Sequence, residues 1–267
     1  MGELVFIGLG LFDENDISLR GLEEARSADS VFAELYTSLM IGLRIKNLEL
    51  LIKDKIVLLT RQNLEEQDGE QILTEAKKGK TVFLVPGDPM IATTHVDLRI
   101  RAERNGIRTR VIHGASITSA AIALSGLQNY KFGRSVTVPF NGNCPVSETP
   151  YNVIKMNMRA GLHTLCFLDL KVEEDQYMHV HTALQMLFSI EDAKHESVIT
   201  DKTLVVGIAR AGSKNPTVKA GLFNEVLEFK FGGPPHILIF PGKLHFVEAE
   251  ALVTLAHAPD IIGGWVK

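Results

Sequence analysis

The chain has 267 residues, of which 45% are apolar and 22% are charged, and its formal net charge is −4. This apolar content excludes a disordered chain, and the length suits one large domain or two of medium size. With 28 basic and 32 acidic residues there is no basic surplus, which argues against a protein that binds nucleic acid through its phosphates.

The beginning of the chain and its cysteines favour a cytoplasmic protein. Glu3 stands where a signal peptide needs a basic residue, and the first apolar run ends at Asp13 and Glu14. We therefore predict no exported and no membrane protein. Cys144 and Cys166 match no metal-binding or redox spacing, so they are predicted to be reduced packing thiols.

The first half of the chain alternates short apolar runs with amphipathic stretches. The predicted strands are residues 4–7, 31–33, 56–59, 81–85 and 110–112. Between them, helices are predicted from the N-cap Ser18 onward, over 69–78 and over 93–104. Because strands and helices alternate and the first strand is apolar on both faces, the pattern predicts an α/β layer with a mostly parallel sheet.

The second half differs in composition, since glycines and prolines recur from Gly133 to Pro150. Predicted there are strands 135–138, 163–168, 204–209, 225–231 and 237–240, helices 151–159, 180–190 and 246–256, and a hairpin around 221–231. We predict an N-terminal α/β domain of residues 1–114 and a C-terminal α/β domain of residues 115–267 with a mixed sheet. The boundary is expected between 113 and 133.

The first predicted strand runs into a glycine-rich turn, Gly8-Leu-Gly-Leu-Phe-Asp13. A dinucleotide-binding loop needs a third small residue where this chain has Asp13. Asp13, Glu14 and Asp16 would also repel a pyrophosphate. A nicotinamide-dependent dehydrogenase therefore stays only as an alternative, and a tight turn explains the two glycines equally well.

Four further turns at predicted strand ends carry glycine. In Pro86-Gly-Asp-Pro89, Asp88 either faces outward to accept from two ribose hydroxyls or caps its own backbone, and both interpretations stay open. The other turns are 114–118, 209–212 and 233–236. Because the turns come from both halves, they predict a ligand in a cleft between two units. No metal-site or serine-hydrolase motif occurs, so neither is predicted.

Seven groups of segments together resemble one family, the diphthine synthases, within the wider tetrapyrrole-methylase-type methyltransferases. They run from the first strand to the last helix: Phe6-Ile-Gly-Leu-Gly-Leu11; Ala33-Glu-Leu-Tyr-Thr-Ser38; Pro86-Gly-Asp-Pro89 with Ala92-Thr-Thr-His95; Ile112-His113 with Ser116-Ile117; Phe167-Leu-Asp169; Ala209-Arg-Ala-Gly-Ser213; and Pro234-Pro-His-Ile-Leu238 with Pro241-Gly-Lys-Leu-His245.

The resemblance implies a fold of two α/β domains with a cofactor in the cleft between them, usually as a homodimer. It also implies methyl transfer from S-adenosyl-L-methionine, leaving S-adenosyl-L-homocysteine, without a metal. The acceptor in this family is the amino group of 3-amino-3-carboxypropyl-histidine on translation elongation factor 2, which receives three methyl groups in the archaeal kind. Cofactor contacts carry over to Leu11, Asp88, Ile91, Ser116, Ile117, Leu168, Ala211 and His236.

Two questions stay open at this stage. A base that deprotonates the amine has three candidates, His95, His113 and Asp169, and none is selected. The alternatives are a tetrapyrrole (precorrin or uroporphyrinogen) C-methyltransferase of the same fold, the dehydrogenase, and a non-catalytic scaffold on the elongation factor.

Overall fold

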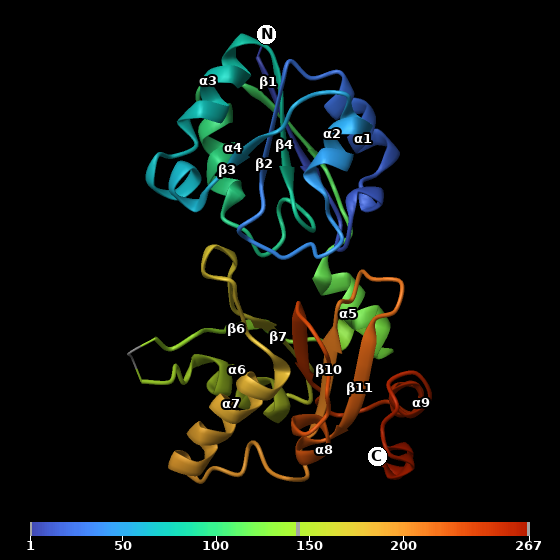
Figure 1. Ribbon diagram of the computed structural model, residues 1–267. Helices are drawn as coiled ribbons and strands as arrows, with labels where there is room; N and C mark the ends of the chain where they lie inside the picture. Colours follow the sequence, from blue (N-terminus) through green and yellow to red (C-terminus); the bar gives the residue numbers. More distant parts are fainter. Residues whose placement is uncertain (1, 143–144, 266–267) are drawn as a thin grey trace. The chain divides into compact units, whose positions relative to one another are not determined.

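The computed structural model describes residues 2–142 and 145–265, so the prediction for Cys144 lies outside the described residues. The chain divides into two compact units (Figure 1). Unit 1 comprises Met1–Ile117 and Val172–Glu174, and unit 2 comprises Thr118–Lys171 and Asp175–Lys267.

Unit 1 is built around a five-stranded parallel sheet in the order β3-β2-β4-β1-β5. All five strands lie where the sequence predicts them: β1 (Glu3–Gly8), β2 (Ser30–Glu34), β3 (Val57–Leu59), β4 (Lys80–Val85) and β5 (Arg108–Ile112). The prediction of a parallel α/β layer is confirmed.

Helices cover both faces of this sheet (Figure 1). They are α1 (Leu19–Arg26), α2 (Ile45–Ile52), α3 (Glu70–Lys78) and α4 (His95–Arg104), with a π-helical turn η2 (Gln62–Glu66) and a 3₁₀ turn η1 (Glu14–Asp16). Alternate residues of β1 point to opposite faces, so Val5 and Ile7 pack with α1 and α2, and Leu4 and Phe6 pack with α3 and α4. Ser18 caps α1 as predicted, accepting from Gly21 N at 3.0 Å.

The strand order places a switch point between β1 and β4. After β1 the chain crosses to β2 on the far side of β4, and after β4 it crosses to β5 on the far side of β1. Connections that leave in opposite directions open a crevice at the carboxyl ends of the two strands, where α/β sheets bind ligands. The loops that follow Gly8 and Val85 lie at this edge.

Unit 2 contains a mixed five-stranded sheet in the order β11-β10-β12-β7-β6, in which only β6 and β7 run parallel. The strands are β6 (Val136–Val138), β7 (Thr164–Leu168), β10 (Leu204–Ala209), β11 (Thr217–Leu222) and β12 (His236–Phe240). The helices are α5 (Ile117–Ser125), α6 (Thr149–Arg159), α7 (Val180–Lys194), α8 (Phe223–Leu227) and α9 (Phe246–Thr254). A short hairpin of β8 (Leu170–Lys171) and β9 (Gln176–Tyr177) and the 3₁₀ turns η3 (Asn129–Lys131) and η5 (Asp260–Gly264) complete the elements of unit 2, and the 3₁₀ turn η4 (Val172–Glu174) is grouped with unit 1. The predicted mixed sheet is confirmed.

The predicted strand 225–231 is wrong. Its first residues belong to the helix α8, whose start is fixed by the carboxylate of Glu225 accepting from Leu222 N at 3.1 Å. The alternating pattern arises because Val226 is buried by α8 and Phe231 is buried against Gly207 of β10. The edge of β10 is instead occupied by β11, which forms the hairpin that the sequence placed further along the chain.

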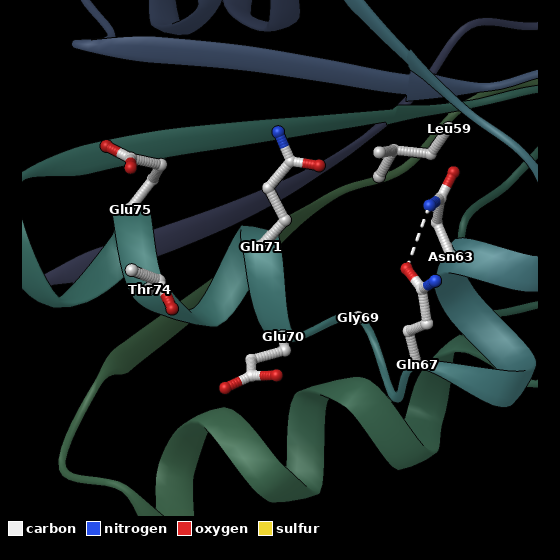
Figure 2. A pocket seen from close by; sticks show the side chains of 8 residues that line it. All are labelled: Leu59, Asn63, Gln67, Gly69, Glu70, Gln71, Thr74 and Glu75. Atoms are coloured by element: carbon white, nitrogen blue, oxygen red, sulfur yellow. Dashed lines mark hydrogen bonds between the residues drawn. The ribbon is translucent and has the colours of Figure 1, made fainter.

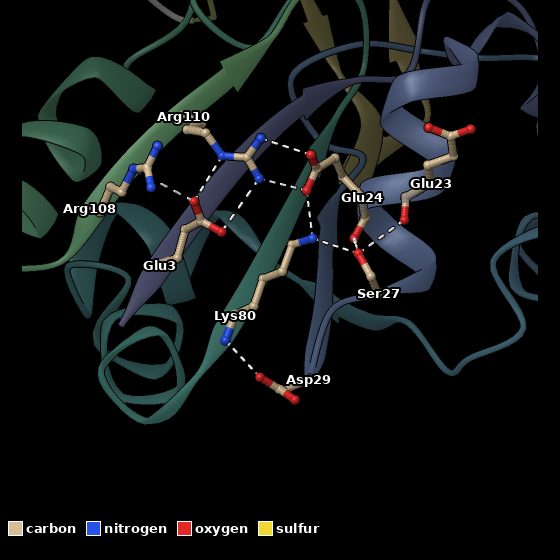
Figure 3. A network of polar contacts seen from close by, with 8 residues as sticks. All are labelled: Glu3, Glu23, Glu24, Ser27, Asp29, Lys80, Arg108 and Arg110. Carbon is tan, nitrogen blue, oxygen red and sulfur yellow. Dashed lines mark hydrogen bonds and ion pairs between the residues drawn. The ribbon is translucent and has the colours of Figure 1, made fainter. Parts of the chain in front are cut away.

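An ionic network ties together the amino-terminal edge of the unit 1 sheet (Figure 3). Arg110 on β5 forms ion pairs with Glu3 of β1 at 2.8 Å and with Glu24 of α1 at 2.6 Å. Lys80 of β4 pairs with Glu24 at 2.5 Å. Hydrogen bonds from Arg110 and Lys80 hold the pKa of Glu24 at about 2, well below its ordinary value.

The network predicts a loss of stability in acid. Because the pKa of Glu24 is depressed in the folded state, its contribution is present above about pH 4.5 and is lost as the pH falls toward 2. We expect Glu24→Gln to lower the free energy of unfolding by ~1–2 kcal/mol near neutral pH. The melting temperature of this variant should also fall less steeply than that of the parent as the pH is lowered from about 4.5 to about 2. The control is Glu23→Gln, an exposed neighbour (Figure 3). Equal acid slopes for the two variants would contradict the prediction.

Candidate functional site

Four glycines bring the backbone together at the switch point of unit 1. A β-carbon at Gly8 would lie 2.5 Å from both Gly87 O and Gly114 N, so no side chain fits there. Gly10 and Gly87 exchange backbone hydrogen bonds of 3.3 and 2.7 Å, and both have positive φ. In contrast, a β-carbon built on Gly87 has only Ala115 O nearby, at 3.9 Å. The backbone after the strands is therefore packed too tightly for a side chain at Gly8, whereas the space beside Gly87 is open.

The loop after β1 uses its amides internally. Leu11 N and Phe12 N donate to Asp16 Oδ2 at 3.0 and 2.7 Å. In a dinucleotide-binding loop, such amides face the pyrophosphate. Glu14 also has internal partners, since it accepts from Arg44 N at 3.2 Å and from Asn47 Nδ2 at 2.7 Å. This loop does not suit a pyrophosphate, and the dehydrogenase alternative is not favoured.

Asp88 lies in the turn after β4 and is 6% exposed. Its Oδ1 accepts from Met90 N at 2.9 Å, which is the Asx-type turn that the sequence analysis left open. Its Oδ2 lies 2.8 Å from His113 Nδ1. His113 follows β5, and its side chain is 75% exposed. The turn thus joins a buried carboxylate to an imidazole that extends into solvent.

The other site residues predicted in unit 1 gather at the same edge. Leu11 lies in the loop after β1, and Ile91, which is 46% exposed, lies just beyond the turn of Asp88. Ser116 is the last residue of the β5–α5 connection and Ile117 begins α5, three and four residues after His113. Unit 1 therefore brings all five of its predicted cofactor residues to the carboxyl end of the sheet.

The three site residues predicted in unit 2 lie at one end of its sheet. Leu168 ends β7, and His236 begins β12, which runs antiparallel to β7. Ala211 follows the end of β10, whose last residue Ala209 pairs with His236. The topology of this sheet brings these residues together although they come from distant parts of the sequence.

Both ring nitrogens of His236 have partners within unit 2. Val180 N donates to Nδ1 at 3.2 Å, so the ring proton lies on Nε2, which donates to the carbonyl oxygens of Gly232 and Gly233 at 3.2 and 3.1 Å. Burial and the neighbouring ring of His179 lower the pKa of His236 to about 4. The imidazole is therefore neutral and held in place within unit 2.

Arg210 is a structural support of this region that the sequence analysis did not single out. Its Nη1 donates to Phe231 O at 3.0 Å and to Gly233 O at 2.6 Å, and its Nη2 donates to Thr217 Oγ1 at 2.7 Å. The guanidinium thus holds the loop before His236 against the β10–β11 turn. The sequence showed the Ala-Arg-Ala-Gly motif, but nothing in it indicated which backbone the arginine holds.

All three base candidates have partners within the chain, and the partner of His113 is Asp88. His95 is 3% exposed, with Nε2 lying 3.2 Å from Glu34 Oε1 and its ring packed edge-on against Phe83. Asp169 accepts from Phe140 N and Leu170 N, both at 2.9 Å, through its two oxygens. His95 therefore has a local structural role, and Asp169 shapes its own loop.

A hollow of about 360 Å³ lies elsewhere in unit 1, beside β3, η2 and α3 (Figure 2). Its lining consists of Leu59, Asn63, Gln67, Gly69, Glu70, Gln71, Thr74 and Glu75, and six of these eight residues have polar side chains. Asn63 Nδ2 donates to Gln67 Oε1 at 3.0 Å across one end of it. It shares no lining residue with the predicted cofactor contacts, so we assign it no part in the chemistry.

Neither a metal-binding group of side chains nor a membrane-spanning helix occurs in residues 2–142 and 145–265. In this part of the chain no three His, Cys, Asp or Glu side chains are grouped so as to hold a metal ion. Among the same residues no helix has both the length and the apolar character needed to cross a bilayer.

Comparison with known proteins places the chain in a family. The model of the tetrapyrrole (corrin/porphyrin) methylases matches residues 3–226. The diphthine synthase of Methanococcoides burtonii is 52% identical over 262 residues, which are 96% of this chain and 97% of that protein. That of Methanosarcina mazei is 52% identical over 264 residues, covering 97% and 98%.

A solved structure agrees with these relatives. The crystal structure of a diphthine synthase, 42% identical, superposes with a TM-score of 0.88 and covers 98% of this chain and 99% of its own. The resemblance seen in the sequence motifs is confirmed, and the tetrapyrrole C-methyltransferase alternative is not favoured. The chain belongs to the tetrapyrrole methylase family, in its diphthine synthase branch, and is a methyltransferase.

Proposed function

We propose that this methyltransferase moves methyl groups from S-adenosylmethionine to the amino group of 3-amino-3-carboxypropyl-histidine on translation elongation factor 2. Three transfers follow one another, and each leaves S-adenosylhomocysteine. The observation that carries the proposal is the identity of about half of all residues to diphthine synthases over nearly the whole length of both chains.

The carboxyl edge of unit 1 fits such a cofactor. The cofactor is a cation, and the edge carries the carboxylate of Asp88 beside an open backbone at Gly87. Leu11 and Ile91 add apolar surface there. We propose that the cofactor contacts are the residues that the family motifs select: Leu11, Asp88, Ile91, Ser116 and Ile117 in unit 1, and Leu168, Ala211 and His236 in unit 2.

The cofactor supplies a methyl carbon that is already activated by its bond to a positively charged sulfur. The residues of the chain therefore need to orient the acceptor nitrogen and to exclude water, and no metal is proposed. Apolar side chains such as Ile91 suit the exclusion of water. The backbone at Gly87 suits close contact with a flat ligand.

The proposed partners are the elongation factor as protein substrate and a second copy of the chain, in the cytoplasm, with neither nucleic acid nor membrane. Large apolar side chains are exposed on α9 and after it, including Phe246 at 59% and Ile261 at 66%, and they suit a homodimer. Light scattering of the purified chain measures its mass directly, and a monomer at micromolar concentration would contradict the homodimer.

The test of the function is methyl transfer to elongation factor 2 that carries the aminocarboxypropyl-histidine. We expect mass spectrometry to show three added methyl groups, and none on the factor with an unmodified histidine. Uroporphyrinogen serves as the control substrate for the sister activity and is expected to remain unmethylated. Absence of transfer to the modified factor would refute the proposal, and a fourth methyl group would correct its stoichiometry.

A further inference from the structure

We propose that His113 is the general base that takes the proton from the acceptor amine before each methyl transfer. The inference rests on the proposed function, because it names a residue for the proton step of that reaction. It comes from the contact between His113 and Asp88 and from the exposure of the imidazole.

The pair has the arrangement that orients a histidine base. A carboxylate accepts hydrogen bonds, so the 2.8 Å contact between Asp88 Oδ2 and His113 Nδ1 places the ring proton on Nδ1. The lone pair of the neutral ring then lies on Nε2, at the far side of an imidazole that is 75% exposed. Asp88 is itself held by Met90 N, so the orientation of the ring is defined by a fixed group.

Two other histidines on the predicted segments lack these properties. His95 is buried against Glu34 and Phe83. His236 has no lone pair to offer, since Nδ1 accepts from Val180 N and Nε2 carries the proton. The exposure of His113 thus distinguishes it from both of these histidines.

The position of His113 agrees with this role. It lies on the connection that leads to Ser116 and Ile117, and it is hydrogen-bonded to Asp88. All three of these residues belong to the proposed cofactor contacts. Gly8, Gly87 and Gly114 hold the three connections tightly together at that point. His113 therefore lies at the same edge of the unit 1 sheet as the proposed cofactor contacts of that unit.

The proton balance of the step is simple. An alkylamine has a pKa of about 10 and is mostly an ammonium at neutral pH, so it has no lone pair for attack. The N–H bond breaks, its electron pair stays on the amine nitrogen, and the proton bonds to Nε2 of His113. The imidazolium then gives this proton to water. Each transfer releases one proton, and the trimethylated product has none left to lose, which ends the series.

Two variants separate a base from a residue that only holds Asp88. His113→Asn keeps an N–H donor for Asp88 but offers no basic nitrogen, and we expect it to lose roughly 100-fold in methyl transfer. His113→Ala should lose as much and should regain activity when imidazole is added. The matched control is His195→Asn, an exposed residue in unit 2 with φ 52°, a conformation that Asn tolerates, and we expect its rate to equal that of the parent.

Three readouts complete the test. The rate restored to His113→Ala by substituted imidazoles should rise with the pKa of the added base. Binding of S-adenosylhomocysteine to His113→Asn, measured by calorimetry, should match the parent. Nitrogen NMR of the parent, with or without cofactor, should show the proton of the neutral His113 ring on Nδ1.

Full activity of His113→Asn, failure of imidazoles to rescue His113→Ala, or a neutral ring protonated on Nε2 would each overturn the inference. These results differ from a failure of the proposed function. In that case the parent chain itself transfers no methyl group to the modified elongation factor.

Discussion

Asp88→Ala is expected to weaken the binding of S-adenosylmethionine and of S-adenosylhomocysteine by roughly 10- to 100-fold, since a hydrogen bond to a charged group contributes ~1.5–3 kcal/mol. The substitution removes the buried carboxylate beside the open backbone of Gly87. It also frees Met90 N and His113, which Asp88 holds at 2.9 and 2.8 Å. Affinity and the geometry of the turn are therefore lost together.

Calorimetry with S-adenosylhomocysteine measures this loss. Asp88→Asn separates the two effects, because an amide oxygen still accepts from Met90 N while the negative charge is gone. Asp97→Ala is the control, since Asp97 is exposed on α4 and pairs with Arg101 at 2.8 Å. Unchanged affinity in Asp88→Ala would remove Asp88 from the cofactor contacts.

Glu248→Ala is expected to lower the free energy of unfolding by ~3–5 kcal/mol, because it leaves buried partners of a charged group unpaired. The carboxylate of Glu248 is fully buried and accepts from Gln128 N at 2.9 Å, His245 N at 2.7 Å and His163 Nε2 at 2.9 Å. Lys131 adds its ammonium to the same group. Burial alone would raise the pKa of Glu248, but these hydrogen bonds outweigh it and hold the pKa at about 2.

Denaturant unfolding with matched variants measures this effect. Glu250→Ala, an exposed position on the same helix, should change the stability by less than ~0.5 kcal/mol. Glu248→Gln should fall between the two, since it keeps one acceptor oxygen. The prediction is contradicted if Glu248→Ala and Glu250→Ala unfold at the same denaturant concentration.

The strands β1, β2 and β4 of unit 1 could be predicted from the sequence because each contains a run of apolar residues buried on both faces. The helix α2 was not predicted, although Ile45, Leu48 and Ile52 have helical spacing. Arg44 provides no side-chain cap, so the usual signal for a helix start is absent there. In unit 2, two segments, β11 and residues 225–231, are candidates to pair with the edge of β10, and β11 occupies it. The alternation of apolar and polar residues within each segment does not reveal which of them pairs.

The candidate site shows a similar division. The Pro-Gly-Asp-Pro turn can be recognised locally, and so can its two possible roles. The contact of Asp88 with His113 joins residues 25 positions apart and arises because β4 and β5 both flank β1. Likewise, the tautomer of His236 depends on Val180, a residue 56 positions away. Sequence motifs therefore indicated which segments form the candidate site. The protonation states of its histidines could be assigned only from contacts made in the folded chain.

The ionic network of Glu3, Glu24, Lys80 and Arg110 has a practical consequence. It occupies the strand ends opposite to those that carry Asp88 and His113, and a six-residue strand such as β1 spans about 20 Å. A spectroscopic probe or an immobilisation point at the network edge would thus lie about 20 Å from the strand ends that carry Asp88 and His113. Substitutions that adapt the protein to heat or acid can be sought at that edge and screened without an activity assay.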